Sequence, residues 1–365
     1  MKYYIIAGES SGDLYGGLLI QELKKLDQKA IFRYWGGPKM ELQSPGMVKS
    51  IKETSFMGFV EVAKNVFTIR EMFSFAKTDI LDWQPDVLIL IDYPGFNLRI
   101  AQWAKQKNIK LAYYVSPQLW AWKENRHKIL RSSTDLFFVI LPFEQDFYRN
   151  LDTPCIYYGH PLIDLIQDRE TKENITVKKV GLFPGSRKQE IKRHLPLMVE
   201  FASRHQQYQF VVAGLSHIPK DFYLDHIPKY VEHMDVEFDN SYEVMSGIDA
   251  AIVSSGTATL ELALFNIPQI VIYKTNPISF AIGKKLVNTE YISLVNLIAQ
   301  KQVVPELLQN ELNIKSLSVA FKQIVQDDKY RNILESYKKI RSELGDGNSS
   351  SKVAVHLYKF LLENQ

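Results

Sequence analysis

Short apolar runs alternate with segments of helical period along almost the whole sequence, and this alternation limits the possible folds more than any other feature. Several runs, such as Val87–Ile91, are apolar at successive positions, which is typical of parallel strands covered on both faces. We therefore expect an α/β fold built from βαβ units. The predicted strands are Tyr3–Ala7, Ile31–Trp35, Val87–Ile91, Lys110–Val115, Leu136–Ile140, Cys155–Tyr158, Val180–Phe183, Phe210–Ala213, Val236–Phe238, Ala250–Val253 and Ile270–Tyr273.

A polar stretch, Gln167–Thr176, interrupts the alternation before it restarts. Two successive βαβ series in 365 residues predict two Rossmann-like, doubly wound domains that face a cleft. We expect residues 1–170 to form the N-terminal domain and residues 171–345 the C-terminal domain. A turn cluster, Gly345–Ser351, precedes a last helix, which either completes the first domain as residues 351–365 or simply ends the second.

The composition describes an ordinary globular protein and narrows its partners. Hydrophobic residues make up 46% and charged residues 23%, and a net charge of +3 is too small to indicate nucleic acid. The single cysteine, Cys155, excludes an internal disulfide and a cysteine-based zinc site. No apolar stretch approaches the roughly 18 residues of a membrane span, and residues 1–7 are too short for a signal peptide. We therefore expect a cytoplasmic protein.

The most informative turn follows the predicted strand Ala250–Val253. The segment Ser254–Thr257 opens a helix, and N–H groups at a helix start suit an anion such as a phosphate because they have no partner within the helix. Glu261 lies four residues after Thr257 on the same helix face, where its carboxylate could accept hydrogen bonds from ribose hydroxyls. The alternative is a turn that only caps the helix, with Glu261 complementing the helix dipole.

Two further strand ends carry polar groups. The first strand ends in Gly8-Glu9-Ser10-Ser11-Gly12-Asp13, which has neither the dehydrogenase glycine pattern nor that of a P-loop. This segment is either a ligand loop or a tight turn with Asp13 in the first helical turn. Asp92 follows Val87–Ile91 at a Pro-Gly turn, where its carboxylate could deprotonate a sugar hydroxyl or merely bond the turn.

The second predicted domain begins with a turn that contains an arginine. Ser186 and Gln189 fit a capping box for the helix that follows, which is the structural explanation of this turn. A capping box does not account for Arg187. The guanidinium fork of Arg187 would suit a diphosphate, which gains negative charge as it leaves.

Two regions could present apolar side chains at the surface. One lies beside a basic segment, and the other is an amphipathic helix. Trp120 and Trp122 precede a basic segment, Lys123–Arg131, and could be core anchors, a stacking surface or a membrane-interface patch. Residues 59–83 have helical period, and Met72 and Phe75 fall opposite the apolar face, so they would add surface for acyl chains or a bilayer. That predicted apolar face consists of Phe59, Val62, Val66, Ile69 and Phe73.

Together these motifs resemble the lipid-A-disaccharide synthase family, inverting glycosyltransferases of the two-Rossmann-domain (GT-B) type. Ser-Pro-Gln-Leu-Trp-Ala-Trp, residues 116–122, is highly specific, whereas Pro-Gly-Ser-Arg and Ser-Gly-Thr recur in other sugar-nucleotide enzymes. The segments that carry the resemblance are Ala7–Asp13, Met57–Val62, Asp92–Asn97, Val115–Trp122, Leu141–Glu144, Gly159–Pro161, Pro184–Arg187, Ser255–Glu261 and Pro305–Gln309.

The resemblance implies a reaction and its setting. A 2,3-diacylglucosamine unit would pass from UDP-2,3-diacylglucosamine to 2,3-diacylglucosamine 1-phosphate, giving UDP and the β-1,6-linked lipid A disaccharide 1-phosphate of Gram-negative lipopolysaccharide. The N-terminal domain would bind the acceptor and the C-terminal domain the UDP-sugar, with no metal or other cofactor. Because both substrates carry acyl chains, the implied location is peripheral, at the inner membrane. The oligomeric state stays open, with a homodimer among the options.

The resemblance also implies roles for particular residues. Asp92 is the candidate general base on the acceptor 6-hydroxyl, and Arg187 is the candidate diphosphate clamp. Asn296 matches a donor-side position, although Val295 stands where a proline is common in the family. The other candidates are Ser186, Ser255, Gly256, Thr257 and Glu261 for the UDP group, Ser11 and Gly12 for the loop beside the acceptor, and Met72, Phe75, Trp120 and Trp122 for acyl chains or membrane.

Two alternatives stand beside this interpretation. One is another UDP-N-acetylglucosamine enzyme of the same architecture, either a 2-epimerase or an undecaprenyl-linked transferase, against which the segment of residues 116–122 argues. The other is a non-catalytic protein that binds lipid or nucleotide with a degenerate transferase fold. The presence of both Asp92 and Arg187 argues against this second alternative.

Overall fold

The computed structural model describes residues 1–54, 66–168, 176–228, 233–276, 280 and 289–364. The chain divides into two compact units, one formed by Met1–Asp164 with Leu344–Gln365 and the other by Leu165–Glu343. Each unit has its own sheet, and every strand pair in both sheets is parallel. The predicted α/β class with two parallel sheets is therefore confirmed.

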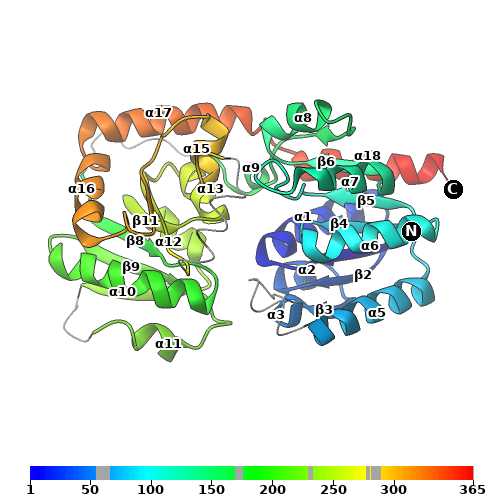
Figure 1. The fold of residues 1–365 in the computed structure, drawn as a ribbon, viewed down its shortest axis with the longest axis horizontal. Helices are drawn as coiled ribbons and strands as arrows, with labels where there is room; N and C mark the ends of the chain where they lie inside the picture. Colours follow the sequence, from blue (N-terminus) through cyan, green and yellow to red (C-terminus); the bar gives the residue numbers. More distant parts are fainter. Residues whose placement is uncertain (55–65, 169–175, 229–232, 277–279, 281–288, 365) are drawn as a thin grey trace. The chain divides into compact units, whose positions relative to one another are not determined.

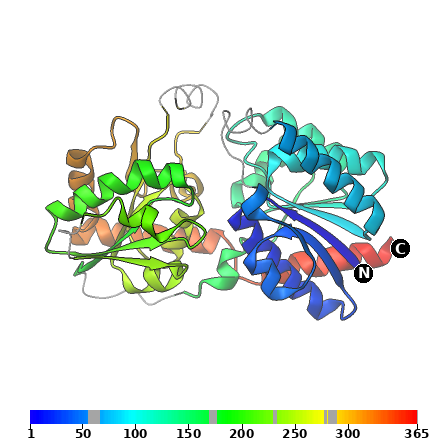
Figure 2. The ribbon, with the colours of Figure 1, turned by 90° about the horizontal axis from the view of Figure 1, so that it is seen from below.

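The first unit contains a seven-stranded sheet in the order β3-β2-β1-β4-β5-β6-β7. Helices cover both faces of this sheet (Figure 2), which is why all five side chains of the central strand β4 are buried and apolar. The strands are β1 (Lys2–Ala7), β2 (Ile31–Gly36), β3 (Met47–Ser50), β4 (Val87–Ile91), β5 (Leu111–Tyr114), β6 (Leu136–Val139) and β7 (Ile156–Tyr157).

All helices of the first unit except α18, which comes after the second unit, follow strands of this sheet. Those between β1 and β4 are α1 (Ser10–Leu26), α2 (Pro38–Gln43), α3 (Ile51–Thr54) and α5 (Val66–Trp83), as Figure 1 shows. Those that follow β4 are α6 (Pro94–Gln106), a 3₁₀ turn η1 (Glu124–Arg126), α7 (His127–Ser133), α8 (Pro142–Arg149) and α18 (Ser349–Glu363), while α9 (Leu162–Leu165) lies at the boundary of the two units.

The second unit contains a six-stranded sheet in the order β10-β9-β8-β11-β12-β13. Its strands are β8 (Lys179–Phe183), β9 (Gln209–Gly214), β10 (Met234–Phe238), β11 (Ala250–Ser254), β12 (Gln269–Tyr273) and β13 (Glu306–Leu308). Its helices are α10 (Lys188–Arg204), α11 (Lys220–Leu224), α12 (Ser241–Gly247), α13 (Thr257–Leu264), α15 (Leu294–Ala299), α16 (Ile314–Ile324) and α17 (Asp327–Glu343).

Each sheet contains a topological switch point, where the strand order reverses and ligands of such folds bind at the carboxyl ends of the strands. In the first sheet it lies between β1 and β4, and in the second between β8 and β11. All the predicted strands are present. Two edge strands, β3 and β13, were not predicted, because they are short and only partly buried, so neither produces an apolar run.

The last helix, α18, packs on α1 of the first unit (Figures 1 and 2). The Asp164 carboxylate accepts hydrogen bonds from the backbone N–H groups of Ser349 at 3.0 Å and Ser350 at 2.9 Å, so it caps the start of α18. The Ser349 hydroxyl donates to the carbonyl of Gly159 at 2.7 Å. These bonds and the buried face of α18 join the end of the chain to the first unit.

The amphipathic segment of residues 59–83 differs from its prediction. Phe59 and Val62 lie outside the described residues, and α5 begins at Val66. Met72 was expected to add exposed apolar surface, but this expectation is wrong, because Met72 is 5% exposed and belongs to the core of the first unit. Phe75 is 43% exposed, as expected, with its ring centroid 6.1 Å from that of Trp35.

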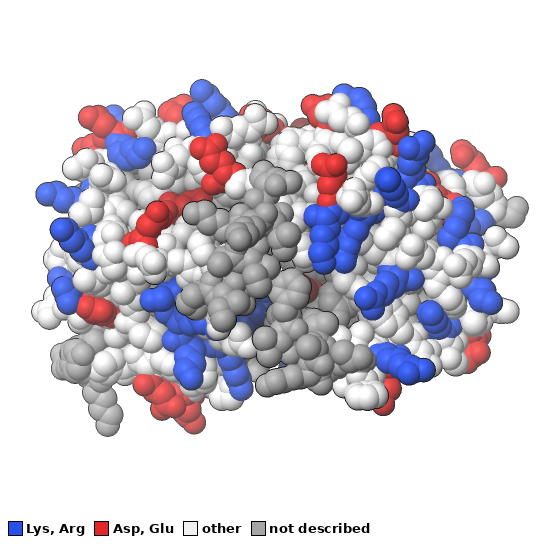
Figure 3. All heavy atoms as spheres, viewed as in Figure 1, with Lys and Arg blue, Asp and Glu red and all other residues white. Residues whose placement is uncertain are grey.

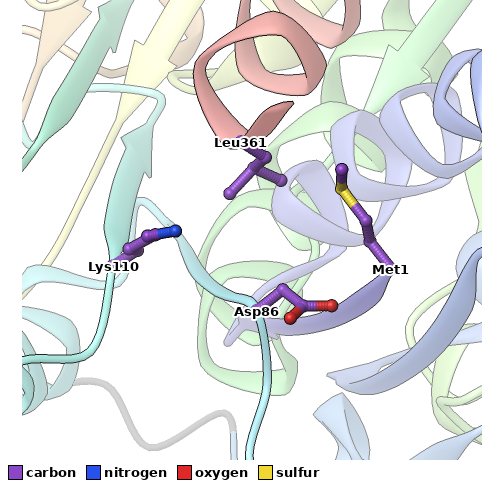
Figure 4. Close-up of a pocket in the computed structure, with 4 residues that line it drawn as sticks. All are labelled: Met1, Asp86, Lys110 and Leu361. Carbon is purple, nitrogen blue, oxygen red and sulfur yellow. The ribbon is translucent and has the colours of Figure 1, made fainter. Parts of the chain in front are cut away.

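On the face that Figure 3 shows, side chains of both signs of charge are interspersed among the described residues. A cavity of about 340 Å³ is lined by Met1, Asp86, Lys110 and Leu361 (Figure 4). Asp86 and Lys110 precede β4 and β5, so this cavity lies at the amino ends of the strands, away from the switch point. Among the helices of the described residues, none is long and apolar enough to cross a bilayer.

Candidate functional site

The register of β1 and β4 brings two predicted loops side by side in the first unit. Ala7 pairs with Ile91, so the loop that begins at Gly8 lies next to Asp92 and Tyr93 at the switch point. A Cβ on Gly8 would overlap the Tyr93 ring, so only glycine fits this position. Gly12 is buried in the first turn of α1, where an added Cβ would lie 3.1 Å from the Cβ of Ala7, and Ser11 beside it is half-buried.

Asp92 has an unusual backbone that its neighbours hold in place. Its φ is 44° and that of Tyr93 is 49°, in the left-handed region that non-glycine residues rarely adopt. The carbonyl of Asp92 accepts hydrogen bonds from the Tyr113 hydroxyl at 2.7 Å and from Asn97 Nδ2 at 2.8 Å. Such strain persists only where the surroundings enforce it, and it is concentrated at functional sites.

The environment of the Asp92 side chain favours its neutral form. Burial raises the pKa of Asp92 to about 8, and the nearby carboxylates of Glu9 and Glu144 act in the same direction. A carboxylate with a pKa near neutrality is a much stronger base than an ordinary aspartate, so Asp92 is suited to accept a proton.

The carboxylate of Asp13, by contrast, has a structural role. It accepts hydrogen bonds from the backbone N–H groups of Gly37 at 2.7 Å and of Lys39 and Met40 at 3.0 Å, which caps α2. The Gly8–Asp13 segment therefore contains both a helix cap and the loop that faces Asp92.

The two tryptophans of the 116–122 segment lie in different surroundings. The Trp120 indole N–H donates to Glu144 Oε1 at 3.1 Å, and its ring packs edge-on against Phe143 with a centroid distance of 5.1 Å. Burial raises the pKa of Glu144 to about 7. Trp122 is half-buried, and the ammonium of Lys123 lies 4.3 Å from the centroid of its ring. Both rings are half-buried, but Trp120 is bonded to the buried carboxylate of Glu144, whereas Trp122 forms a cation–π pair.

At the second switch point, Val253 of β11 pairs with Phe183 of β8, so the loops that follow these strands are neighbours. Arg187, in the loop after β8, forms an ion pair with Glu190, with Nη1 and Oε1 2.7 Å apart. The predicted capping box of Ser186 and Gln189 is wrong. Glu190 Oε2 accepts from the N–H of Ser186 at 2.9 Å and of Arg187 at 3.3 Å instead, because α10 begins at Lys188, so that Arg187 is the N-cap and Glu190 is the third residue of the helix.

In the loop after β11, the groups that could bind a ligand are backbone N–H groups rather than side chains. The Ser255 hydroxyl donates to the carbonyl of Ile292 at 2.9 Å, so it holds the loop in place. Gly256 has extended backbone, and among the described residues no atom lies within 4 Å of a Cβ built there. Among the described residues, neither conformation nor packing requires glycine at this position. Thr257 begins α13 and is half-buried.

Glu261 is fixed by a residue that the sequence did not single out. The Tyr242 hydroxyl donates to Glu261 Oε1 at 2.9 Å, and the Tyr242 ring packs on Phe265 with a centroid distance of 5.4 Å. Burial raises the pKa of Glu261. Tyr242 was missed because it lies on another helix, 19 residues away, in a segment without a motif.

Asn296 does not fit its predicted role in donor binding. It is fully buried, and its Nδ2 donates to the carbonyl of Val304 and to Glu306 Oε1, both at 2.9 Å. Its Oδ1 accepts from the N–H groups of Val303 at 2.8 Å and Val304 at 3.0 Å. Because both donors and the acceptor are used internally, Asn296 holds α15 in place in this structure rather than facing a ligand.

Apart from Asn296 and the candidates for acyl chains or membrane, the predicted site residues therefore lie at two switch points, one in each unit. Ser11, Gly12 and Asp92 meet at the first, in the unit that also contains Trp120 and Trp122. Ser186, Arg187, Ser255, Gly256, Thr257 and Glu261 belong to the loops and helix at the second.

Comparison with known proteins gives one family over nearly the whole chain. The model of a family described as lipid-A-disaccharide synthetase matches residues 3–357. The chain is 36% identical to the lipid-A-disaccharide synthase of Trichlorobacter lovleyi, over 97% of this chain and 96% of that protein. It is 35% identical to the enzyme of the same name from Coxiella burnetii, over 98% of each chain.

Solved structures resemble the fold at low identity. A UDP-GlcNAc 2-epimerase from Neisseria meningitidis, bound to UDP-GlcNAc, matches with a TM-score of 0.64 at 14% identity, over 98% of this chain and all of the other. MurG from Acinetobacter baumannii matches with a TM-score of 0.55 at 10% identity, over 98% and 99% of the two chains. These similarities support the GT-B type of fold and nothing finer.

Proposed function

Because the chain belongs to the lipid-A-disaccharide synthase family and is a glycosyltransferase with that activity, we propose how its residues divide the reaction. The first unit binds the acceptor, 2,3-diacylglucosamine 1-phosphate, and supplies the base. The second unit binds UDP-2,3-diacylglucosamine and stabilises the leaving UDP. The main support is the position of Asp92, a carboxylate with raised pKa at the switch point of the first sheet.

In this proposal Asp92 accepts the proton of the acceptor 6-hydroxyl as its oxygen attacks the anomeric carbon of the donor. The new C–O bond forms on the face opposite the diphosphate, so the configuration inverts to β as the bond to UDP breaks. Negative charge then moves onto the diphosphate. The guanidinium of Arg187 and the N–H groups at the start of α13 would stabilise that charge, and Glu261 would accept bonds from the ribose hydroxyls.

The ion pair of Arg187 with Glu190 supports a clamp that is oriented before the donor arrives. Glu190 bonds the N–H groups of residues 186 and 187 as well as the Arg187 guanidinium, so one carboxylate shapes the loop and directs the arginine. Arg187 Nη1 donates to Glu190 Oε1 at 2.7 Å. A planar fork that is held at one end loses less entropy when it binds a diphosphate.

Mass spectrometry of the reaction products tests the proposed reaction directly. Purified protein with UDP-2,3-diacylglucosamine and 2,3-diacylglucosamine 1-phosphate should form a disaccharide monophosphate with four acyl chains and one UDP per disaccharide. UDP-N-acetylglucosamine, which lacks these chains, is the control and should give no such product. Binding of UDP without its release in the presence of both acylated substrates would instead support a non-catalytic binding protein.

We also propose that the protein works at the inner-membrane surface. Phe67 is 81% exposed and Phe75 43% exposed on α5, and burial of each ring in a bilayer would stabilise binding by about 2 kcal/mol. Replacement of both by Ser should lower the binding to anionic phospholipid vesicles at least tenfold with little change in Tm. The control Met72→Ser should lower Tm instead, since Met72 is buried. Unchanged vesicle binding of the double variant would exclude α5 as the membrane contact.

A homodimer stays a prediction, and sedimentation equilibrium of the detergent-free protein would test it.

A further inference from the structure

His194 is a fully buried histidine that the proposed reaction does not use. It lies in the second turn of α10, among the buried side chains of that helix. Its Nδ1 lies 2.9 Å from the carbonyl oxygen of Pro184, and its Nε2 lies 3.0 Å from the backbone nitrogen of Lys274. Both ring nitrogens therefore bond to backbone groups outside its own helix.

The two partners determine which ring nitrogen carries the proton. The carbonyl of Pro184 can only accept a hydrogen bond and the N–H of Lys274 can only donate one. The ring must therefore be neutral, with a proton on Nδ1 and a lone pair on Nε2. Burial lowers the pKa of His194, against smaller opposing effects of the bond to Pro184 and of Glu190, while Arg193 lowers it further. The neutral form is thus the stable one.

The two backbone groups belong to loops on either side of the predicted phosphate loop. Pro184 directly follows β8, and Lys274 directly follows β12. In the sheet these two strands flank β11, whose own loop contains Ser255, Gly256 and Thr257. One imidazole therefore connects the two neighbours of the phosphate loop.

We infer that His194 is a positioning residue, which holds the loop that contains Arg187 at a set distance from the loop after β12 and so maintains the shape of the diphosphate site. This inference rests on the role proposed above for Arg187. Arg187 lies three residues after Pro184, so a shift of the Pro184 carbonyl would move the guanidinium. Displacements of about 1 Å can reduce turnover by two orders of magnitude.

Three substitutions separate the two bonds of His194. His194→Gln places an amide oxygen near the position of Nε2 and keeps an acceptor for Lys274. His194→Asn places an amide N–H near the position of Nδ1 and keeps a donor for Pro184. His194→Leu keeps the bulk and removes both bonds. We expect kcat to fall roughly tenfold in the Leu variant and less in the other two, with Asn retaining more activity than Gln because it keeps the bond to the arginine loop.

A matched control comes from another histidine near the end of the same helix. His205 Nδ1 donates to the carbonyl of Phe201, on its own helix, at 2.8 Å, and connects no loops. His205→Gln should change kcat less than twofold. A similar loss of kcat in His205→Gln would mean that any disturbance of this helix lowers activity, and would overturn the inference.

A double-mutant cycle with Arg187 distinguishes positioning from simple stabilisation. If His194 acts through Arg187, His194→Leu should lower kcat roughly tenfold in the wild-type background and less than twofold in the Arg187→Ala background, measured well below Tm. Equal losses in both backgrounds would overturn the inference, as would a Leu variant with lower Tm and normal kcat. Absence of turnover by the wild-type protein would instead contradict the proposed function, so the two failures are distinguishable.

Discussion

The two switch points of this molecule are built in opposite ways. At the first, one carboxylate is the central group. The side chains of Tyr113 and Asn97 hold its strained backbone in place, and the ring of Tyr93 packs against Gly8. At the second, Gly256 is exposed, and no atom of the described residues lies within 4 Å of a Cβ built on it. The groups that this loop offers are mainly backbone N–H groups.

This difference follows from the two tasks that we propose. A base must be desolvated and held rigidly, because its pKa and its distance to the proton determine the rate. A diphosphate instead needs several donors and room for the ligand, which backbone N–H groups beside a glycine provide. The comparison therefore predicts that substitutions at the first switch point affect chemistry or folding, whereas those at the second affect ligand binding and leaving-group stabilisation.

The largest effect should come from Asp92→Asn, which keeps the shape of the side chain and removes the base. We expect kcat to fall by roughly two or more orders of magnitude with an unchanged fold, measured as UDP release and by circular dichroism. Asp79→Asn is the control, since Asp79 pairs with Arg33 at 2.5 Å in the same unit and should lower Tm rather than kcat. Near-normal turnover of Asp92→Asn would remove this residue from the mechanism.

Arg187→Ala should have the next largest effect, a loss in kcat of about a hundredfold, because the lost charge acts on the leaving diphosphate in the transition state. Steady-state kinetics would separate kcat from KM. A rise in KM with unchanged kcat would show that Arg187 contributes equally to ground-state and transition-state binding, and the second switch point would then serve binding alone.

The pH dependence of kcat/KM reports on the first switch point. Asp92 acts as a base only when deprotonated, and its pKa is raised to about 8, so activity should increase with pH and level off above 8. The increase between pH 7 and pH 9 should be about tenfold. Glu9→Gln removes one of the carboxylates that raise this pKa and should move the profile to lower pH. A flat profile between pH 6 and 9 would contradict this role of Asp92.

The smallest effect should come from alanine substitutions of two glycines. Gly256→Ala has space for its methyl group, so Tm should stay constant while KM for the UDP-sugar rises about fivefold, equivalent to about 1 kcal/mol. Gly8→Ala should lower Tm, because its Cβ would overlap the Tyr93 ring. Equal losses of Tm in both variants would remove the contrast between the two switch points.

The sequence predicted the strands well because a strand covered on both faces must be an apolar run, as Val87–Ile91 shows. It also placed Asp92 and Ser255–Thr257 at strand ends, since a polar residue directly after such a run lies at an edge of the sheet. The sequence did not predict the order of the strands in each sheet. This order is what makes β1 a neighbour of β4, and β8 a neighbour of β11.

The errors arose where the role of a residue depends on distant contacts. Asn296 matched a family position, but its amide bonds Val303, Val304 and Glu306, partners that no local pattern reveals. Met72 was misplaced because the buried stripe of α5 is wider than the predicted face. Phe73 next to it also packs inward, with its ring 4.3 Å from that of Phe96.

The path of α18 has a consequence for the order in which the chain folds during synthesis. The second unit, Leu165–Glu343, is inserted between two parts of the first. A ribosome therefore completes the whole second unit before it makes the helix that packs on α1 and that Asp164 caps. The second unit can fold while the first still exposes the apolar surface of α1, so the part of the chain that is made first is the last to be finished.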